Sequence, residues 1–284
     1  MRAFEQLRHW PAGADPHGGP AVVVIGGGGA AGDTVAATGP VQRAFPLASV
    51  TKPLIALAVL VAVEEGTVAL DDPAGPPGST VRHLMAHASG LAPDGDAVLA
   101  PPARRRIYSN TGFEVLGRHL EAASGLGVAT YLHEAVVESL GLDATALPVG
   151  ASPAHGAHAS AADLARVARE LLEPTLIDPA TLAEATSPAF PDLAGVLPGF
   201  GTQDPNPWGL GFEIRGHKAP HWTAPTGSAR TFGHFGRAGT FCWVDPVAGV
   251  GCVVLTDVGF GPWAVEAWPA FNDAVLAELG RSGP

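Results

Sequence analysis

The longest apolar run of the chain begins at residue 54 and predicts a buried helix. Leu54 to Val63 is apolar on every helical face, so the helix should have protein all around it. Ser49 and Thr51 are candidate N-cap residues, and Gly66 is a candidate C-terminal stop. The run is too short to cross a membrane.

Strand patterns lie near both ends of the chain. Residues 2–9 predict a short amphipathic helix, and residues 21–25 and 33–38 predict two strands. Four segments after residue 207 have the β-branched and aromatic content of strands: Gly209–Arg215, Thr231–His234, Thr240–Val244 and Val250–Thr256. A turn at 245–249 joins the last two, and residues 263–279 predict a final helix.

Helical patterns fill the middle of the chain. They cover 81–87, a segment ending near Ser124, 128–139, and a segment that a Ser160-x-x-Asp163 capping box opens. Residues 174–207 are rich in proline and have no clear assignment. This order predicts an α/β (α+β) lobe built from 1–70 and 208–284. A mostly helical lobe, 71–207, would be inserted into it, with the active site between the two.

A glycine-rich segment contains Gly27-x-Gly29-x-x-Gly32, which formally matches the dinucleotide-binding fingerprint. The residues after it predict a returning strand rather than a helix, and no acidic residue follows about 20 positions later. We therefore reject nucleotide binding and expect a hairpin connection.

The composition favours a compact, loop-rich enzyme. The 284 residues are 46% hydrophobic and 15% charged, with 37 Gly and 27 Pro. The net charge of −11 and the absence of a long basic stretch argue against nucleic acid or a membrane as partner. No signal sequence is recognisable at the N-terminus, so we expect a cytoplasmic protein.

Two cysteines form neither a disulfide framework nor a zinc pattern, and we expect no metal or other cofactor. If the turn at 245–249 centres on Val247, Cys242 and Cys252 lie opposite each other on adjacent strands. Even so, we expect two reduced, buried thiols. His83 and His87 have the i, i+4 spacing of some metal sites, but no third ligand accompanies them, which favours structural roles; the same holds for His155 and His158.

Ser49 and Lys52 share one helical face because they are three residues apart. A serine hydroxyl becomes a strong nucleophile only when a base takes its proton. A lysine that is buried in an apolar wall can lose its charge and become that base. The alternative is a capping serine beside a lysine whose charged end reaches solvent.

Three short motifs follow one another along the chain: Ser49-Val-Thr-Lys52, Tyr108-Ser-Asn110 and His234-Phe-Gly236. This order resembles the serine β-lactamase and penicillin-binding-protein superfamily. The tyrosine that opens the second triplet points to the class C-like branch. That branch includes class C β-lactamases, DD-carboxypeptidases, D-aminopeptidases, family VIII carboxylesterases and acyltransferases.

Further segments resemble the same branch: His83–Leu91, Tyr108–Gly117, Ala161–Arg166, Gly233–Gly236 and Trp243–Pro246. The resemblance covers roughly residues 20 to 257. It implies a β-lactamase/transpeptidase-like fold, in which terminal helices flank an antiparallel sheet and a helical lobe is inserted.

The resemblance also implies roles for individual residues. Ser49 would attack a carbonyl group, while Lys52 and Tyr108 would remove its proton. Asn110 would hold Lys52 and donate to the substrate. The backbone N–H groups of Ser49 and Arg237 would form the oxyanion hole, where each donor is typically worth about 3 kcal/mol. Tyr108 would protonate the leaving group and then activate water; the alternative is an amphipathic core tyrosine.

The third triplet departs from the penicillin-recognising pattern. His234 stands where those enzymes favour lysine, and Phe235 where they favour threonine or serine, ahead of Gly236. Those two side chains normally meet the substrate carboxylate, whereas histidine is mostly neutral at pH 7 and phenylalanine donates nothing. Arg104 to Arg106 could supply a substitute cation, although a solvated loop is the simpler interpretation.

The sequence thus predicts a serine hydrolase that acts through an acyl-enzyme on ester or small amide substrates. An acyltransferase, a D-amino-acid peptidase or a β-lactamase of the same fold is the first alternative. A catalytically silent binding protein is the second, and the intact Ser49, Lys52 and Tyr108 argue against it.

Overall fold

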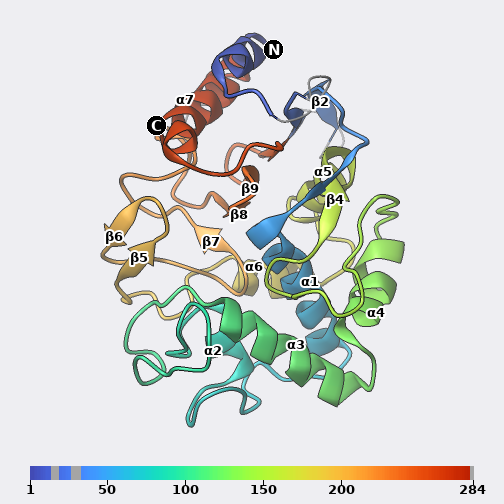
Figure 1. Ribbon diagram of the computed structural model, residues 1–284, viewed down its shortest axis with the longest axis vertical. Coiled ribbons are helices and arrows are strands. Elements are labelled where there is room, and N and C mark those ends of the chain that lie inside the picture. The colour runs from blue at the N-terminus through green and yellow to red at the C-terminus, as the bar shows by residue number, and fades with distance from the viewer. Residues whose placement is uncertain (14–18, 27–32, 282–284) are drawn as a thin grey trace.

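The computed structural model describes residues 1–13, 19–26 and 33–281, and an antiparallel sheet lies at its centre (Figure 1). The six strands of the sheet are, in spatial order, β2 (Thr34–Thr38), β1 (Ala21–Gly26), β10 (Val250–Leu255), β9 (Thr240–Asp245), β8 (Phe232–Gly236) and β7 (Glu213–Ile214). Because β1 pairs with β10, the two ends of the chain build one sheet, as predicted.

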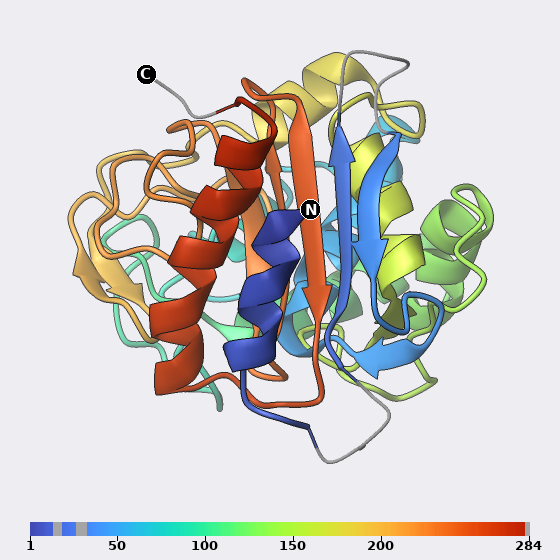
Figure 2. The same ribbon diagram turned by 90° about the horizontal axis from the view of Figure 1, so that it is seen from above.

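Helices cover both faces of this sheet. On one face, η1 (Arg2–His9) lies beside α7 (Pro262–Glu278), as Figure 2 shows. On the other face, α5 (Ala161–Glu170) packs against β1 and β10. Strand β1 is apolar throughout because its alternate side chains enter two different cores.

Helix α1 (Thr51–Glu64) is the predicted buried helix, and every residue from Thr51 to Leu60 is buried. It ends before Gly66, which has the left-handed φ of 76° expected of a C-terminal stop. The predicted N-cap is wrong. A 3-10 turn, η2 (Ala48–Val50), runs into α1 without a break, so Val50 is the N-cap and no side chain caps the helix.

The remaining helices lie mostly at the opposite end of the molecule from α7 (Figure 1). They are α2 (Val81–Met85), α3 (Asn110–Ser124), α4 (Val128–Leu132), its π-helical continuation η3 (His133–Glu138), and α6 (Pro179–Ala185). These bounds confirm the helices predicted from residue 81 to residue 139. Helix α5 is also confirmed, and the Ser160 hydroxyl accepts from the Asp163 N–H at its start.

Two small sheets complete the fold, one formed by β3 (Ala44–Pro46) and β4 (His158–Ser160), the other by β5 (Gly195–Leu197) and β6 (Gly201–Gln203). Helix α6, β5 and β6 therefore occupy the segment 174–207 that had no assignment. The division into lobes at 70 and 208 stays a prediction, and α5 packs on the sheet although it comes from the middle of the chain.

The strand predicted over 209–215 is wrong in extent, since β7 covers only Glu213–Ile214. Gly211 has a left-handed φ of 87°, which breaks an extended strand. A Cβ atom at Gly209 would lie 2.0 Å from the Ala185 carbonyl oxygen, so this segment packs closely against the end of α6. The predicted glycine connection at 27–32 lies outside the described residues, and β1 and β2 on either side of it pair antiparallel.

The predicted pairing of the two cysteines is also wrong. Cys242 pairs with Val253, and Cys252 pairs with Trp243. The turn is one residue longer than a turn centred on Val247 requires, and a one-residue shift sends a side chain to the opposite face. Both thiols are buried and free, as expected, but they lie in the two different cores.

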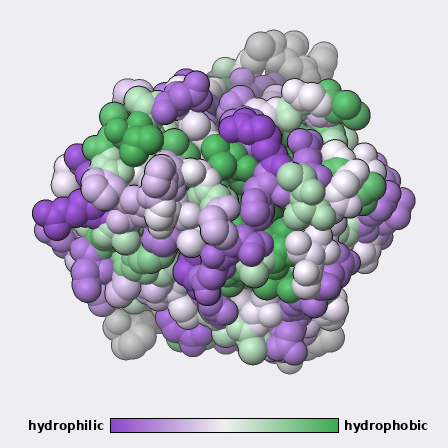
Figure 3. Space-filling view, turned by 90° about the horizontal axis from the view of Figure 1, so that it is seen from below, coloured by the Kyte–Doolittle hydropathy of each residue, from purple (hydrophilic) through white to green (hydrophobic). Residues whose placement is uncertain are grey.

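The surface seen from below mixes hydrophilic and apolar side chains (Figure 3). The large apolar side chains that are exposed among the described residues are Val35, Val98, Leu99, Leu126, Val149, Val196 and Val247. No helix within the described residues has both the length and the apolar character needed to cross a membrane.

The positions of the two cysteines lead to a test in solution. Burial raises the pKa of the Cys242 thiol to about 12 and that of the Cys252 thiol well above its usual range. We expect a thiol reagent such as DTNB to leave both cysteines unmodified in the folded protein and to titrate two thiols after unfolding. An intramolecular disulfide found by mass spectrometry without reductant would contradict this placement.

Candidate active site

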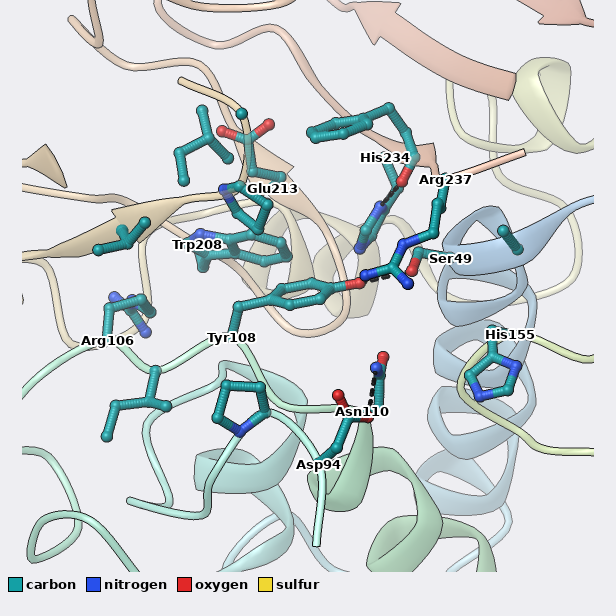
Figure 4. A pocket seen from close by; sticks show the side chains of 18 of the residues that line it. Ser49, Asp94, Arg106, Tyr108, Asn110, His155, Trp208, Glu213, His234 and Arg237 are labelled. Atoms are coloured by element: carbon teal, nitrogen blue, oxygen red, sulfur yellow. Dashed lines mark hydrogen bonds between the residues drawn. The ribbon is translucent and has the colours of Figure 1, made fainter. Parts of the chain in front are cut away.

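Ser49 and Lys52 lie where η2 passes into α1, with the serine half-buried and the lysine fully buried. Figure 4 shows the serine beside the cavity and Tyr108 directed toward it. The Tyr108 hydroxyl donates to Ser49 Oγ over 2.7 Å. Lys52 Nζ lies 3.3 Å from Ser49 Oγ and 2.8 Å from Tyr108 OH, so the three groups form a closed hydrogen-bonded triangle.

Two further oxygen atoms hold Lys52 Nζ. It lies 2.8 Å from Asn110 Oδ1 and 3.0 Å from the Ala154 carbonyl oxygen. An ammonium group has three protons to donate, fewer than its four oxygen neighbours. A neutral amine would instead accept one hydrogen bond from Tyr108 or Ser49. The arrangement therefore suits a lysine that exchanges a proton with its neighbours.

The environment of Lys52 favours that exchange near neutral pH. Burial lowers the pKa of Lys52 to about 7, although the carboxylates of Asp94 and Glu114 raise it. A substantial fraction of the amine is thus uncharged at pH 7 and can accept the proton of Ser49. The Lys52 side chain is fully buried, which excludes the alternative in which its charged end reaches solvent.

Tyr108 lies on the loop before α3, and Ser109 caps that helix by accepting from the Gly112 N–H. The tyrosine ring packs against the rings of His87 and Trp208. Burial raises the pKa of Tyr108 above its usual value, and the hydrogen bond with Ser49 only partly offsets this. Tyr108 therefore keeps its proton in the resting site, which leaves Lys52 as the candidate base.

Asn110, the first residue of α3, accepts from Lys52 with Oδ1 and donates from Nδ2 to Asp94 over 2.9 Å. The amide plane is therefore held from both ends. Asp94 was not identified from the sequence, because an acidic residue in a proline-rich loop carries no motif.

The end of strand β8 approaches the serine turn closely, and Gly236 permits that approach. A Cβ atom at Gly236 would lie 2.3 Å from the Leu47 carbonyl oxygen, closer than any side chain allows. The Thr240 hydroxyl donates to the same carbonyl over 2.8 Å and fastens the two segments together. Arg237, which follows Gly236, therefore lines the same cavity as Ser49.

His234 is buried beside Tyr108 and Trp208. Its Nδ1 atom lies 2.7 Å from the Phe235 carbonyl oxygen and must therefore carry a proton that it donates. Burial and the nearby Lys52 lower the pKa of His234 to about 3, so the ring is neutral at pH 7. The third triplet thus provides no cation in this position.

The Phe235 ring lines the cavity and packs against Phe260 and Trp268 at centroid distances of 5.0 Å and 5.9 Å. Val196 and Leu197 from β5 add apolar surface to the same cavity, which has a volume of about 810 Å³. A space of this size holds a small organic molecule.

Arg106 fits neither of the two interpretations of Arg104 to Arg106, a substitute substrate-binding cation or a solvated loop. It is buried, and its guanidinium donates to the carbonyl oxygens of Ala86, Ala189, Phe190 and Asn206. It therefore holds loops together and is neither a solvated residue nor a free substrate-binding cation. Arg104 and Arg105 are exposed.

The histidine pair has structural roles. His83 Nδ1 lies 2.9 Å from the Thr80 hydroxyl, and His87 Nδ1 accepts from the Ser109 N–H. Within the described residues, no group of three or more histidine, cysteine or acidic side chains could hold a metal ion. His155, by contrast, is exposed and lines the cavity.

Sequence reasoning also missed the floor of the cavity, where Trp208 and Glu213 lie. Glu213 accepts from Lys218, from His221 and from the Trp222 indole N–H. Burial alone would raise the pKa of Glu213, but His221 and Lys218 outweigh it and lower the pKa to about 2. Its negative charge is thus balanced within the protein, and no spacing pattern marks these residues.

Comparison with known proteins identifies the family. The beta-lactamase family model matches residues 12–276, so the chain belongs to this family of serine hydrolases. A beta-lactamase structure from Mycobacterium bovis is 54% identical, with a TM-score of 0.92, and the match covers 98% of this chain and 99% of that one.

A more distant solved structure shows the same fold, and a further relative matches part of the sequence. The octameric penicillin-binding protein homologue from Pyrococcus abyssi is 21% identical with a TM-score of 0.73, over 99% of this chain and 76% of that one. Penicillin-binding protein 4* from Bacillus subtilis (strain 168) is 29% identical over 135 residues, 36% of this chain and 30% of that protein. The chain thus matches less than a third of the length of that relative. The predicted superfamily and fold class are confirmed.

The proton exchange at Lys52 leads to a pH test. Because only the uncharged amine accepts a proton, the acylation rate should rise with pH through about 7. The Asp94 carboxylate raises the pKa of Lys52, so Asp94→Asn should shift the midpoint to lower pH by about 0.2–0.7 unit, the range expected for an exposed charge.

The measurement is the single-turnover acylation rate between pH 5 and 9, with Asp96→Asn as the control, because Asp96 is exposed and does not line the cavity. If the midpoint of the rise in acylation rate with pH is unchanged or higher in Asp94→Asn, this rise does not report the ionisation of Lys52.

Proposed function

We propose that the protein is a serine hydrolase that cleaves ester or small amide substrates through an acyl-enzyme on Ser49. The observation that carries the proposal is the contact of Ser49 Oγ with both Tyr108 OH and Lys52 Nζ, at 2.7 Å and 3.3 Å. A nucleophile within hydrogen-bond reach of a base, which other groups orient in turn, is the geometry that covalent catalysis requires.

In the acylation step, Ser49 Oγ bonds to the substrate carbonyl carbon, and its proton passes to Lys52 directly or through Tyr108. The backbone N–H groups of Ser49 and Arg237 would bind the developing oxyanion. As the bond to the leaving alcohol or amine breaks, Tyr108 would donate a proton to it and recover one from Lys52. Water then attacks the acyl-enzyme with the same groups as base and acid.

Asn110 is a positioning residue in this proposal. Its Oδ1 holds Lys52, and its Nδ2 is occupied by Asp94 through one N–H, which leaves the second N–H for a substrate oxygen. Gly236 acts through the backbone, since it allows β8 to approach the serine turn.

The cavity favours a neutral ester over a β-lactam. Neutral His234 and apolar Phe235 occupy the positions that meet the substrate carboxylate in penicillin-recognising relatives. A carboxylate placed there would lose charge-assisted hydrogen bonds of about 1.5–3 kcal/mol each. The aromatic wall formed by Phe235 and Phe260 instead offers apolar contact to an ester.

A β-lactamase is the second candidate, because the Mycobacterium bovis relative at 54% identity is described as one. An acyltransferase would use the same acyl-enzyme and differ in the acceptor. A silent binding protein is disfavoured because it needs no lysine of lowered pKa beside the serine.

A fluorophosphonate probe tests the covalent step. We expect stoichiometric labelling of Ser49, identified by peptide mass spectrometry, and no labelling in Ser49→Ala. Lys52→Met should slow labelling by about two orders of magnitude or more, since the serine loses its base. Arg118→Gln is the control, because Arg118 is exposed and outside this cavity. Failure of the folded wild-type protein to react would refute the proposal.

Substrate preference is tested with short-chain p-nitrophenyl esters and nitrocefin. We expect kcat/KM for the esters to exceed that for nitrocefin by about two to four orders of magnitude, given two lost contacts with the carboxylate. The double variant His234→Lys, Phe235→Thr should narrow the gap by improving nitrocefin. A higher kcat/KM for nitrocefin in the wild-type protein would favour the β-lactamase alternative.

A further inference from the structure

The charge around the cavity differs from the charge of the protein as a whole. The chain has a net charge of −11. The charged side chains that line the cavity are three arginines, Arg105, Arg106 and Arg237, and two acids, Asp94 and Glu213, of which Glu213 is paired with buried Lys218. The cavity therefore carries positive charge in an otherwise acidic protein, which would concentrate anions there.

Two exposed arginines account for this positive charge, Arg105 and Arg237. Throughout residues 1–13, 19–26 and 33–281, neither guanidinium has an acidic partner within 4.0 Å. Arg106, the third arginine of the cavity wall, already donates to backbone carbonyls. Arg105 and Arg237 thus remain available to a ligand.

Arg237 lies nearest to the reacting groups. Figure 4 shows its side chain extending from the end of β8 across the cavity toward Ser49 and the Tyr108 hydroxyl. Its charge also acts on Tyr108 and lowers the pKa of that phenol against the larger opposing effect of burial. The direction of the side chain and its effect on the pKa of Tyr108 therefore both indicate that the Arg237 guanidinium lies near the Tyr108 hydroxyl.

We propose that the Arg237 side chain holds an acidic group of the substrate, attached a few bonds from the carbonyl carbon that Ser49 attacks. The inference rests on the proposed function and names its substrate class: esters or amides that carry a carboxylate on either the acyl or the alcohol portion. A guanidinium presents five N–H donors in a planar fork that matches a carboxylate, which explains why arginine suits this position.

This binding position differs from the position of a β-lactam carboxylate in penicillin-recognising relatives. That carboxylate is fixed on a fused ring and meets the side chains that correspond to His234 and Phe235, neither of which is a cation here. The carboxylate of a flexible ester can turn toward Arg237 instead. Its apolar portion would still contact Phe235 and Phe260.

The test compares acidic esters with matched neutral ones in two arms. For an acid on the acyl portion, the pair is p-nitrophenyl hydrogen adipate and its methyl ester. For an acid on the alcohol portion, the pair is 3-acetoxybenzoate and its methyl ester. In wild type we expect kcat/KM of the acid to exceed that of the neutral ester about tenfold or more in at least one arm, and the arm that responds locates the acid.

Arginine variants then test whether Arg237 causes the higher kcat/KM of the acidic ester. In Arg237→Gln the ratio of kcat/KM for the acidic ester to kcat/KM for the neutral ester should fall to near one, even if both values change. In Arg237→Lys part of the ratio should remain, because the charge is kept without the fork. In wild type the ratio should decrease with added salt, since the site is open to solvent. Arg230→Gln, an exposed arginine outside the cavity, should keep the wild-type ratio.

Two results would overturn the inference: a ratio near one in both arms for wild type, or a ratio that Arg105→Gln lowers while Arg237→Gln leaves it unchanged. Neither touches the proposed hydrolase function, which turnover of the neutral esters and labelling of Ser49 measure separately. Absence of turnover for all four esters together with absence of labelling would count against both.

Discussion

The active site depends on the burial of one amino group. Lys52 is on a helix whose first three turns are enclosed by protein, so its amine has lost its water and its pKa falls to about 7. The four oxygen atoms around Nζ come from the serine turn, the loop before α3, the start of α3 and a distant loop. Each of these segments must be placed correctly for the Lys52 amine to be removed from water and still have hydrogen-bond partners. The same contacts that hold the Lys52 amine therefore tie Ser49 to the rest of the fold.

A second constraint is the close approach of β8 to the serine turn. Gly236 leaves room for the Leu47 carbonyl, and Thr240 donates to that carbonyl from the neighbouring strand. The approach brings Arg237 into the same cavity as Ser49, where we propose that its backbone N–H binds the oxyanion and its side chain binds the substrate. One residue would thereby contribute to both rate and specificity.

The electrostatics of the cavity follow from which charges are already paired. His234 is neutral because burial and Lys52 both disfavour its cation, and Glu213 is ionised but forms an ion pair with buried Lys218. The Arg106 guanidinium already donates hydrogen bonds to backbone carbonyl oxygens. Arg237 has no such partner among the described residues. The sequence motif ends before Arg237 and includes only His234 at the position expected to hold a cation. In the substrate complex that we propose, the positive charge therefore lies on Arg237, just after the end of β8, and not at His234, where penicillin-recognising relatives favour lysine.

The sequence by itself determined the strands at both ends, the buried helix and the three short motifs, because these depend on local periodicity and on short spacings. It did not determine the register between β9 and β10, where one extra turn residue sends Cys242 and Cys252 into different cores. Nor did it identify Asp94, Trp208 and Glu213, which reach the cavity from loops and from a two-residue strand without any motif. The tertiary structure alone decided the state of each ionisable group. Lys52, Arg106 and Arg237 are all cations by residue type, but burial lowers the pKa of Lys52, backbone carbonyls bind Arg106, and Arg237 lines the cavity without an acidic partner among the described residues.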